Sequence, residues 1–214
     1  APSSSPSRDR TAVLLAINDV YRIEGLQEGT IGGLARVRAL RKELEREAPD
    51  LLMLHGGDFL FPSFASRMYR GAQMISVLND LDGDTAAFDP RMFVTLGNHE
   101  FDQRRLRDSR VLTDRIEESQ FRWLAGNINF ANGPDGKPLV ASKNLSRTAI
   151  VESGGIRIGL FGLTIPTLGV EYIKDFAGEQ ATARELIAEL RAQKAEVIVG
   201  LTHLNAFEDR RLME

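Results

Sequence analysis

Short apolar segments alternate with amphipathic segments along this chain, and the alternation constrains the fold more than any other feature. The apolar segments are rich in Val, Ile and Leu, and most are followed closely by Gly, Asn or Asp, as buried strands are. Strands are therefore expected at residues 12–17, 51–55, 92–95, 156–161 and 197–201. This order of elements is typical of a layered α/β fold, with a β-sheet core covered by helices.

The segments between the expected strands have the spacing of covering helices. Apolar side chains recur at helical spacing at Leu34, Val37, Leu40 and Leu44, and again at Ala183, Leu186, Ile187 and Leu190. Arg41 and Glu45 stand four residues apart, so they are expected to pair on the first helix.

The composition fits one globular domain that is free of disulfides. The chain has 214 residues, 43% hydrophobic and 27% charged, with no cysteine. Its net charge of −3 comes from interspersed acidic and basic side chains, so no nucleic-acid partner is expected. No apolar run approaches the roughly 18 residues that a membrane span needs.

The first ten residues are rich in Ser and Pro and are expected to form a flexible tail. Such a tail can remain after a signal peptide is removed, which would place the protein in the periplasm or outside the cell, although an engineered start would look the same. The catalytic domain is expected to occupy residues 11–214.

Four polar residues stand within a few positions of the end of an expected strand: Asp19, Asp58, Asn98 and His203. In open α/β sheets, the carboxyl ends of the strands line the crevice where ligands bind. Oxygen and imidazole ligands without sulfur suit two divalent ions such as Mn, Zn, Fe or Mg. Taken singly, Asn98 could be a helix cap and His203 a core histidine, but their joint placement favours a metal site.

Four short motifs carry a resemblance to a known family: Asn18-Asp19-Val20-Tyr21, Gly57-Asp58, Gly97-Asn98-His99-Glu100 and Leu201-Thr202-His203-Leu204. In this order they resemble the motifs of the calcineurin-like metallophosphoesterases, in their 5′-nucleotidase-like branch. The resemblance implies that Asp58 bridges two metal ions. It also implies that Asp19 binds the first ion, while Asn98 and His203 bind the second.

The resemblance assigns catalysis to His99 and Asp102. The protonated imidazole would stabilise or protonate the departing oxygen, and the aspartate would hold the ring. Tyr21 occupies the place where the family usually has a metal-binding histidine. Either Tyr21 ligates the metal as phenolate or the first metal site is weaker. His55 lies three residues before Asp58, and a structural role is expected for it.

The family's later Gly-His-x-His motif, which gives one histidine to each metal, does not occur in the 214 residues. We therefore expect the fold to be incomplete at its C-terminus, with an apolar face exposed near Ile158 and Val197. The missing C-terminal segment or a second copy of the chain is the expected partner for that face. The chain alone is expected to bind metal weakly and to show little activity.

The resemblance predicts a metal-dependent hydrolase of phosphate esters, 5′-nucleotidase-like, in which a metal-bound hydroxide attacks the phosphorus of a nucleotide. Two alternatives stay open. One is a phosphodiesterase of cyclic nucleotides or nucleotide sugars, because the same metal core serves both. The other is a fragment that binds metal or phosphate without catalysis.

Overall fold

The computed structural model describes residues 10–214. The expected tail therefore lies outside the described residues, except for Arg10. This residue is not free: its guanidinium forms an ion pair with Glu196, with Nη2 and Oε2 2.7 Å apart, and donates to the carbonyl of Gly155. The last residue of the expected tail is thus attached to the folded domain.

The larger sheet is parallel throughout. Its strands, in spatial order, are β1 (Leu14–Ile17), β2 (Leu52–His55), β3 (Met92–Thr95), β4 (Arg122–Leu124) and β6 (Leu145–Ser146). The register pairs Ile17 with His55 and His55 with Val94. Because the strands are parallel, the carboxyl ends of β1, β2 and β3 meet at one edge of the sheet.

A second sheet packs on the first. It has the order β10 (Val197–His203), β8 (Ile156–Thr164) and β7 (Thr148–Ser153), with β10 parallel and β7 antiparallel to β8. The register places His203, at the end of β10, beside Thr164. A separate antiparallel pair joins β5 (Ile128–Phe130) to β9 (Ile173–Phe176).

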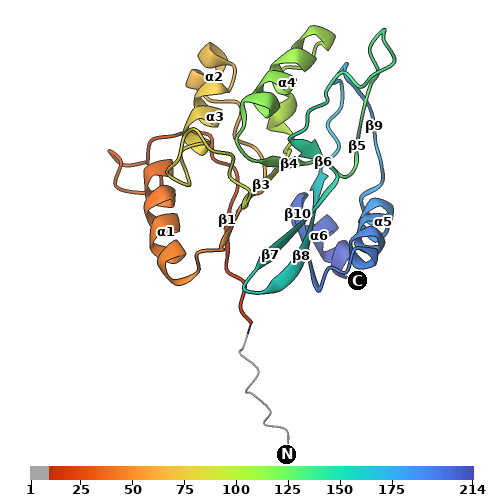
Figure 1. Ribbon diagram of the computed structural model, residues 1–214. Coiled ribbons are helices and arrows are strands. Elements are labelled where there is room, and N and C mark those ends of the chain that lie inside the picture. The colour runs from red at the N-terminus through yellow and green to blue at the C-terminus, as the bar shows by residue number, and fades with distance from the viewer. Residues whose placement is uncertain (1–9) are drawn as a thin grey trace, which may run out of the picture.

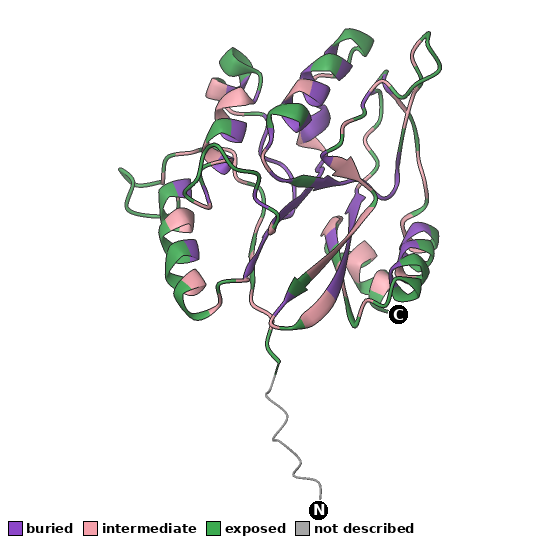
Figure 2. Ribbon diagram, in the orientation of Figure 1, coloured by how far each residue is buried: buried purple, intermediate pink, exposed green. Residues whose placement is uncertain are grey.

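Helices cover the outer faces of both sheets (Figure 1). They are α1 (Leu34–Glu47), α2 (Phe64–Tyr69), α3 (Ala72–Leu78), α4 (Ser109–Glu118), α5 (Glu179–Ala192) and α6 (Ala206–Met213), with short 3₁₀ turns η1 (His99–Phe101) and η2 (Leu106–Asp108). Helices α1, α3 and α4 share a core with the larger sheet, and α5 shares one with the smaller sheet. Buried residues concentrate on the strands and on the inner sides of the helices (Figure 2).

Alternation along the strands explains the layers. In β2 and β3, Leu52, Leu54 and Phe93 point between the sheets and meet Ile158 and Leu160 of β8. The intervening residues, Met53, Met92 and Val94, belong to the core under the helices. Successive strand residues face opposite sides, so a strand buried on both faces reads as a continuous apolar run. The predicted layered α/β fold is confirmed.

All five expected strands form, and β8 and β10 extend beyond the predicted ends. The prediction that each is buried was wrong for β1 and β10: Leu14 is 42% exposed and Val197 is 43% exposed. Both strands lie at an edge of their sheet. Of the apolar face expected near Ile158 and Val197, Val197 is exposed as expected, but Ile158 is 1% exposed and packs between the sheets.

Helix α1 differs from its predicted apolar stripe. Leu40 is 45% exposed, whereas the neighbouring Arg41 is 2% exposed. The guanidinium of Arg41 donates to Glu45, as predicted from the spacing, and also to Asp89 in the loop before β3, both at 2.7 Å. A buried guanidinium needs such partners, so the loop before β3 decides which side of α1 is buried.

Candidate metal centre

The ends of four strands place the four predicted ligands together. Asp19 follows β1 by two residues, Asp58 follows β2 by three, and Asn98 follows β3 by three, while His203 is the last residue of β10. One ligand atom each from Asp19, Asp58 and His203 lies within 4.8 Å of the others. The smaller sheet thus delivers its histidine to the edge where the larger sheet delivers two carboxylates.

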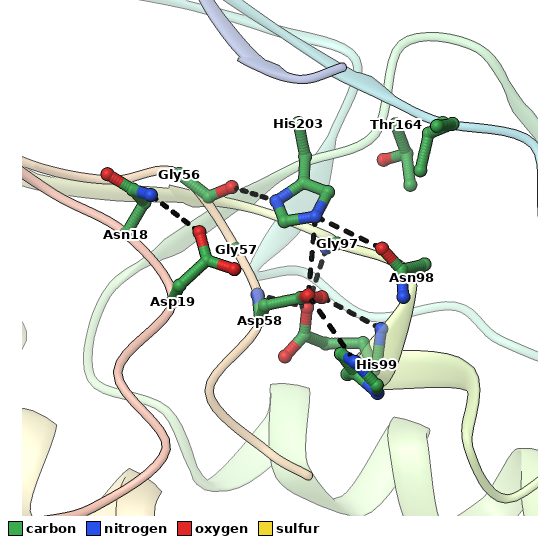
Figure 3. A network of polar contacts seen from close by, with 12 residues as sticks. Asn18, Asp19, Gly56, Gly57, Asp58, Gly97, Asn98, His99, Thr164 and His203 are labelled. Atoms are coloured by element: carbon green, nitrogen blue, oxygen red, sulfur yellow. Dashed lines mark hydrogen bonds and ion pairs between the residues drawn. The ribbon is translucent and has the colours of Figure 1, made fainter. Parts of the chain in front are cut away.

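His203 connects the other members of the site (Figure 3). Its Nε2 lies 3.3 Å from Oδ2 of Asp58 and 3.2 Å from Oδ1 of Asn98. Its Nδ1 donates to the carbonyl oxygen of Gly56 at 2.7 Å. This hydrogen bond fixes the ring orientation and leaves Nε2 as the nitrogen that faces the site, which is how metal-binding histidines are commonly held.

The electrostatics of His203 and Asp58 are coupled. Burial opposes the charge on His203, but the hydrogen bond and the negative charge of Asp58 outweigh burial and raise the pKa of His203 to about 9. Burial likewise opposes the charge on Asp58, yet the hydrogen bonds from His203 and from the backbone N–H of His99 lower its pKa. A cation at Nε2 must displace a proton from His203.

Glu100 belongs to the site, although the sequence motif that contains it gave no role to its side chain. This side chain is 1% exposed and accepts four backbone N–H groups. Oε2 accepts from Asp58 at 2.8 Å and Gly97 at 2.6 Å, and Oε1 accepts from Phe59 at 2.8 Å and Leu60 at 3.0 Å. One carboxylate therefore joins the loop that carries Asp58 to the loop that carries Asn98.

The sequence offered a weak signal for Glu100, since an acidic residue directly after His99 complements a helix N-terminus. Burial and the negative charge of Asp58 raise its pKa, and the backbone N–H groups act against that rise. The neighbouring Gly97 is required sterically, because a Cβ there would collide with Oδ1 of Asp58. Asp58 itself has a left-handed backbone, with φ of 60°.

His99 and Asp102 form the pair expected from the resemblance. Nδ1 of His99 lies 3.0 Å from Oδ2 of Asp102. The other ring nitrogen, Nε2, lies 4.0 Å from Oδ2 of Asp58, so the imidazole faces the same site. The ring is partly exposed and can meet a ligand.

Tyr21 points into the site. Its hydroxyl donates to Oδ1 of Asp19 at 2.9 Å and to Oδ2 of Asp58 at 3.1 Å. Burial raises the pKa of Tyr21, and both carboxylates raise it further. The hydroxyl therefore lies between the two aspartates, within hydrogen-bond distance of both.

His55 is the last residue of β2, and its ring packs against that of Phe59 in the core. It is fully buried, and its Nδ1 accepts the backbone N–H of Gly57 at 3.1 Å. Burial lowers the pKa of His55 to about 3, so the ring is neutral. These contacts agree with the structural role predicted for it.

The donor set fits a divalent metal ion. Two carboxylates, an imidazole nitrogen and the amide oxygen of Asn98 converge, and no thiolate is present in the chain. Such ligands suit Mn²⁺, Mg²⁺, Zn²⁺ or Fe²⁺.

The helices of residues 10–214 include none with the length and apolar character of a membrane span.

Two relatives show what the chain is similar to. A probable 5′-nucleotidase of Treponema pallidum is 30% identical over 182 residues, which cover 81% of this chain and 27% of that protein. The crystal structure of a 5′-nucleotidase precursor from Thermus thermophilus superposes with a TM-score of 0.74 at 27% identity. That match covers 93% of this chain and 38% of the other. The chain thus spans well under two thirds of either relative.

The fold recurs in a more distant structure. The NAD nucleotidase NadN of Haemophilus influenzae has a TM-score of 0.73 at 22% identity, which is a likeness of fold. The family model for calcineurin-like phosphoesterases matches residues 12–212, nearly the whole chain. Members of this family use divalent metal ions. The chain belongs to the calcineurin-like phosphoesterase family.

Proposed function

We propose that this chain forms the metal-binding part of a phosphoester hydrolase of the 5′-nucleotidase type, acting on nucleoside monophosphates. The observation that carries the proposal is the convergence of Asp19, Asp58 and His203 from two different sheets within 4.8 Å. Similarity to 5′-nucleotidases of two organisms supports the choice of substrate.

Two divalent ions are proposed, with Asp58 as the shared ligand. Asp58 is central, because its carboxylate faces Tyr21, His203 and His99 at once. Asp19 is proposed for one ion, and Asn98 and His203 for the other. Such ions supply charge neutralisation for the phosphate and lower the pKa of a water molecule.

His99 is proposed to protonate the departing oxygen of the ester. Asp102 orients the imidazole through Nδ1, so Nε2 faces the site and is proposed as the proton donor. The proton then passes from Nε2 to the departing alkoxide. Tyr21 is proposed to coordinate a metal ion or to contact a metal-bound water, because its hydroxyl lies between Asp19 and Asp58.

The test is phosphate release from AMP with Mn²⁺. We expect weak release, in line with the little activity expected of the chain alone, that stops on chelation and is lost in Asp58→Asn. Metal binding without release would support the non-catalytic alternative. Release that persists in Asp58→Asn would place catalysis elsewhere.

A periplasmic or secreted location is part of the proposal. The Ser- and Pro-rich composition of residues 1–10 supports it. Fractionation of cells that produce the protein would test it, and recovery in the cytoplasmic fraction alone would contradict it.

A further inference from the structure

Thr164 is the last residue of β8 and lies at the edge where both sheets reach the candidate metal centre (Figure 3). Its side chain is fully buried, and in the register of the smaller sheet it stands beside His203. Its hydroxyl donates across to the larger sheet, to the carbonyl oxygen of Leu96 at 2.6 Å. Leu96 directly follows β3 and stands two residues before Asn98. One hydroxyl thus joins the strand next to His203 to the loop that carries Asn98.

The ligands of the proposed second ion come from different sheets. His203 belongs to the smaller sheet and Asn98 to a loop of the larger one, yet Nε2 of His203 and Oδ1 of Asn98 lie 3.2 Å apart. The hydrogen bond from Nδ1 of His203 to Gly56 links the histidine to the loop of Asp58, but not to the loop of Asn98. We propose that Thr164 is a positioning residue that holds Asn98 at the distance from His203 at which both can bind one metal ion. The inference rests on the metal centre of the proposed function.

The backbone of Thr164 is fixed on both sides. The side chain of Asn127, in the loop after β4, is 1% exposed. Its Oδ1 accepts the N–H of Thr164 at 2.9 Å, and its Nδ2 donates to the carbonyl of Thr164 at 2.8 Å. An amide side chain suits this place, because it supplies one acceptor and one donor. On the other side, the N–H of Ile165 donates to the carbonyl of His203 at 2.8 Å. The hydroxyl therefore starts from a fixed backbone, and its bond to Leu96 can set the spacing of the loop.

The two sheets approach closely enough for one hydroxyl to span them. The backbone N–H of Gly126, after β4, donates to the carbonyl of Gly162 in β8 at 2.8 Å. A Cβ at Gly162 would collide with the carbonyl of Leu124, so glycine is needed there for the close approach. At this spacing the short side chain of Thr164 reaches Leu96 directly.

The test removes the hydroxyl of Thr164 and measures Mn²⁺ affinity by calorimetric titration. Thr164→Val keeps the size of the side chain and loses the donor, whereas Thr164→Ser keeps the donor. Thr95→Val is the matched control. Thr95 is also fully buried, and its hydroxyl also donates to a backbone carbonyl, that of Leu124 at 3.1 Å, but this bond lies within the larger sheet.

We expect Thr164→Val to bind Mn²⁺ about tenfold more weakly than the unmodified chain. This is the lower end of the roughly 10–100-fold cost of losing an outer contact, because the hydroxyl acts on the loop and not on the ligand itself. Thr164→Ser and Thr95→Val should keep the affinity of the unmodified chain. Unchanged affinity in Thr164→Val would overturn the proposal, and so would an equal loss in Thr95→Val. If Thr164→Val does not fold, Thr164→Ala takes its place, since it puts no methyl group against the carbonyl of Leu96.

A second comparison shows whether Thr164 acts through Asn98. In an Asn98→Ala background the amide ligand is gone, so adding Thr164→Val should cause little further loss of Mn²⁺ affinity. A general loosening of the fold would instead lower the affinity by the same factor in both backgrounds. That result would contradict a positioning role.

The outcome stays separable from the proposed function. If the unmodified chain binds no Mn²⁺, the proposed function fails, and the geometry is then measured without metal. Nuclear Overhauser contacts between the ring of His203 and the side-chain amide of Asn98 report on their distance. We expect these contacts in the unmodified chain and in Thr164→Ser, and we expect them to be lost in Thr164→Val. Contacts that persist in Thr164→Val would show that the hydroxyl does not set this distance.

Discussion

The carboxylate of Glu100 accepts the backbone N–H of Asp58 at 2.8 Å, from within the core. The same oxygen accepts the N–H of Gly97, so one buried group fixes both loops that reach the metal centre. Outer contacts of this kind orient metal ligands and tune their affinity. Glu100 therefore acts as a positioning residue for Asp58.

Replacement of Glu100 by Gln should weaken metal binding. The amide nitrogen would face two backbone N–H groups in place of an acceptor, so the loop at Asp58 would shift. We expect a loss of about 10–100-fold in Mn²⁺ affinity, the usual cost of losing an outer partner. Calorimetric titration measures it, on protein shown by circular dichroism to be folded.

The control for Glu100→Gln is Glu43→Gln, which changes an exposed carboxylate on α1 in the same way. It should leave Mn²⁺ affinity unchanged. If Glu100→Gln binds Mn²⁺ as tightly as Glu43→Gln does, the hydrogen bonds of the Glu100 carboxylate do not position Asp58.

Asp58→Asn should reduce metal binding more than His203→Ala does. Asp58 is proposed to contact both ions, and His203 only one. We expect the Asp58 variant to lose more than the roughly 100-fold that an outer partner costs. Titration with Mn²⁺ compares the two variants, and equal losses would argue against a bridging Asp58.

His99→Asn should separate catalysis from metal binding. The backbone N–H of His99 that holds Asp58 is kept, so metal content should stay near that of the unmodified protein. Turnover should fall by about 10²–10⁴-fold, as for loss of a general acid. Metal analysis and phosphate release are the measurements, and a metal-depleted variant would identify His99 as a ligand.

The lowered pKa of His55 predicts that the folded protein loses stability in acid. Its folded pKa is lowered to about 3, whereas the unfolded value is about 6.5, so only the unfolded chain takes up a proton between these values. The stabilising contribution is present above pH 6.5 and is lost as the pH falls toward 3. By pH 5 the loss should be about 2 kcal/mol in the free energy of unfolding.

Chemical denaturation at pH 7 and pH 5 measures this loss, with His55→Asn as the comparison. The Asn side chain can still accept the N–H of Gly57 but cannot titrate. Carboxylates contribute equally to both proteins, so the difference between their pH slopes isolates His55. Identical slopes would mean that the buried ring does not oppose protonation.

The main strands and the four candidate ligands could be predicted from the sequence. Runs such as residues 51–55 and 92–95 are apolar because both faces are buried, and that signal is local. Five strands were missed: β4, β5, β6, β7 and β9. Among them, β4 and β6 have only three and two residues, so tertiary pairing more than local pattern makes them strands. Helices α2, α3, α4 and α6 were missed as well, and α2 and α6 contain no buried apolar residue that would mark a core-facing stripe.

The sequence by itself determined which side chains stand at strand ends, because Asp19, Asp58, Asn98 and His203 follow apolar runs that can be read locally. Only the tertiary structure decided that His203, at the end of β10 in the second sheet, reaches Asp58. It also decided that the carboxylate of Glu100 joins the loop of Asp58 to the loop of Asn98. Hydrogen bonds to backbone groups about 40 residues away leave no periodic trace in a sequence. Such contacts depend on how the two sheets pack, and packing is a property of the whole chain.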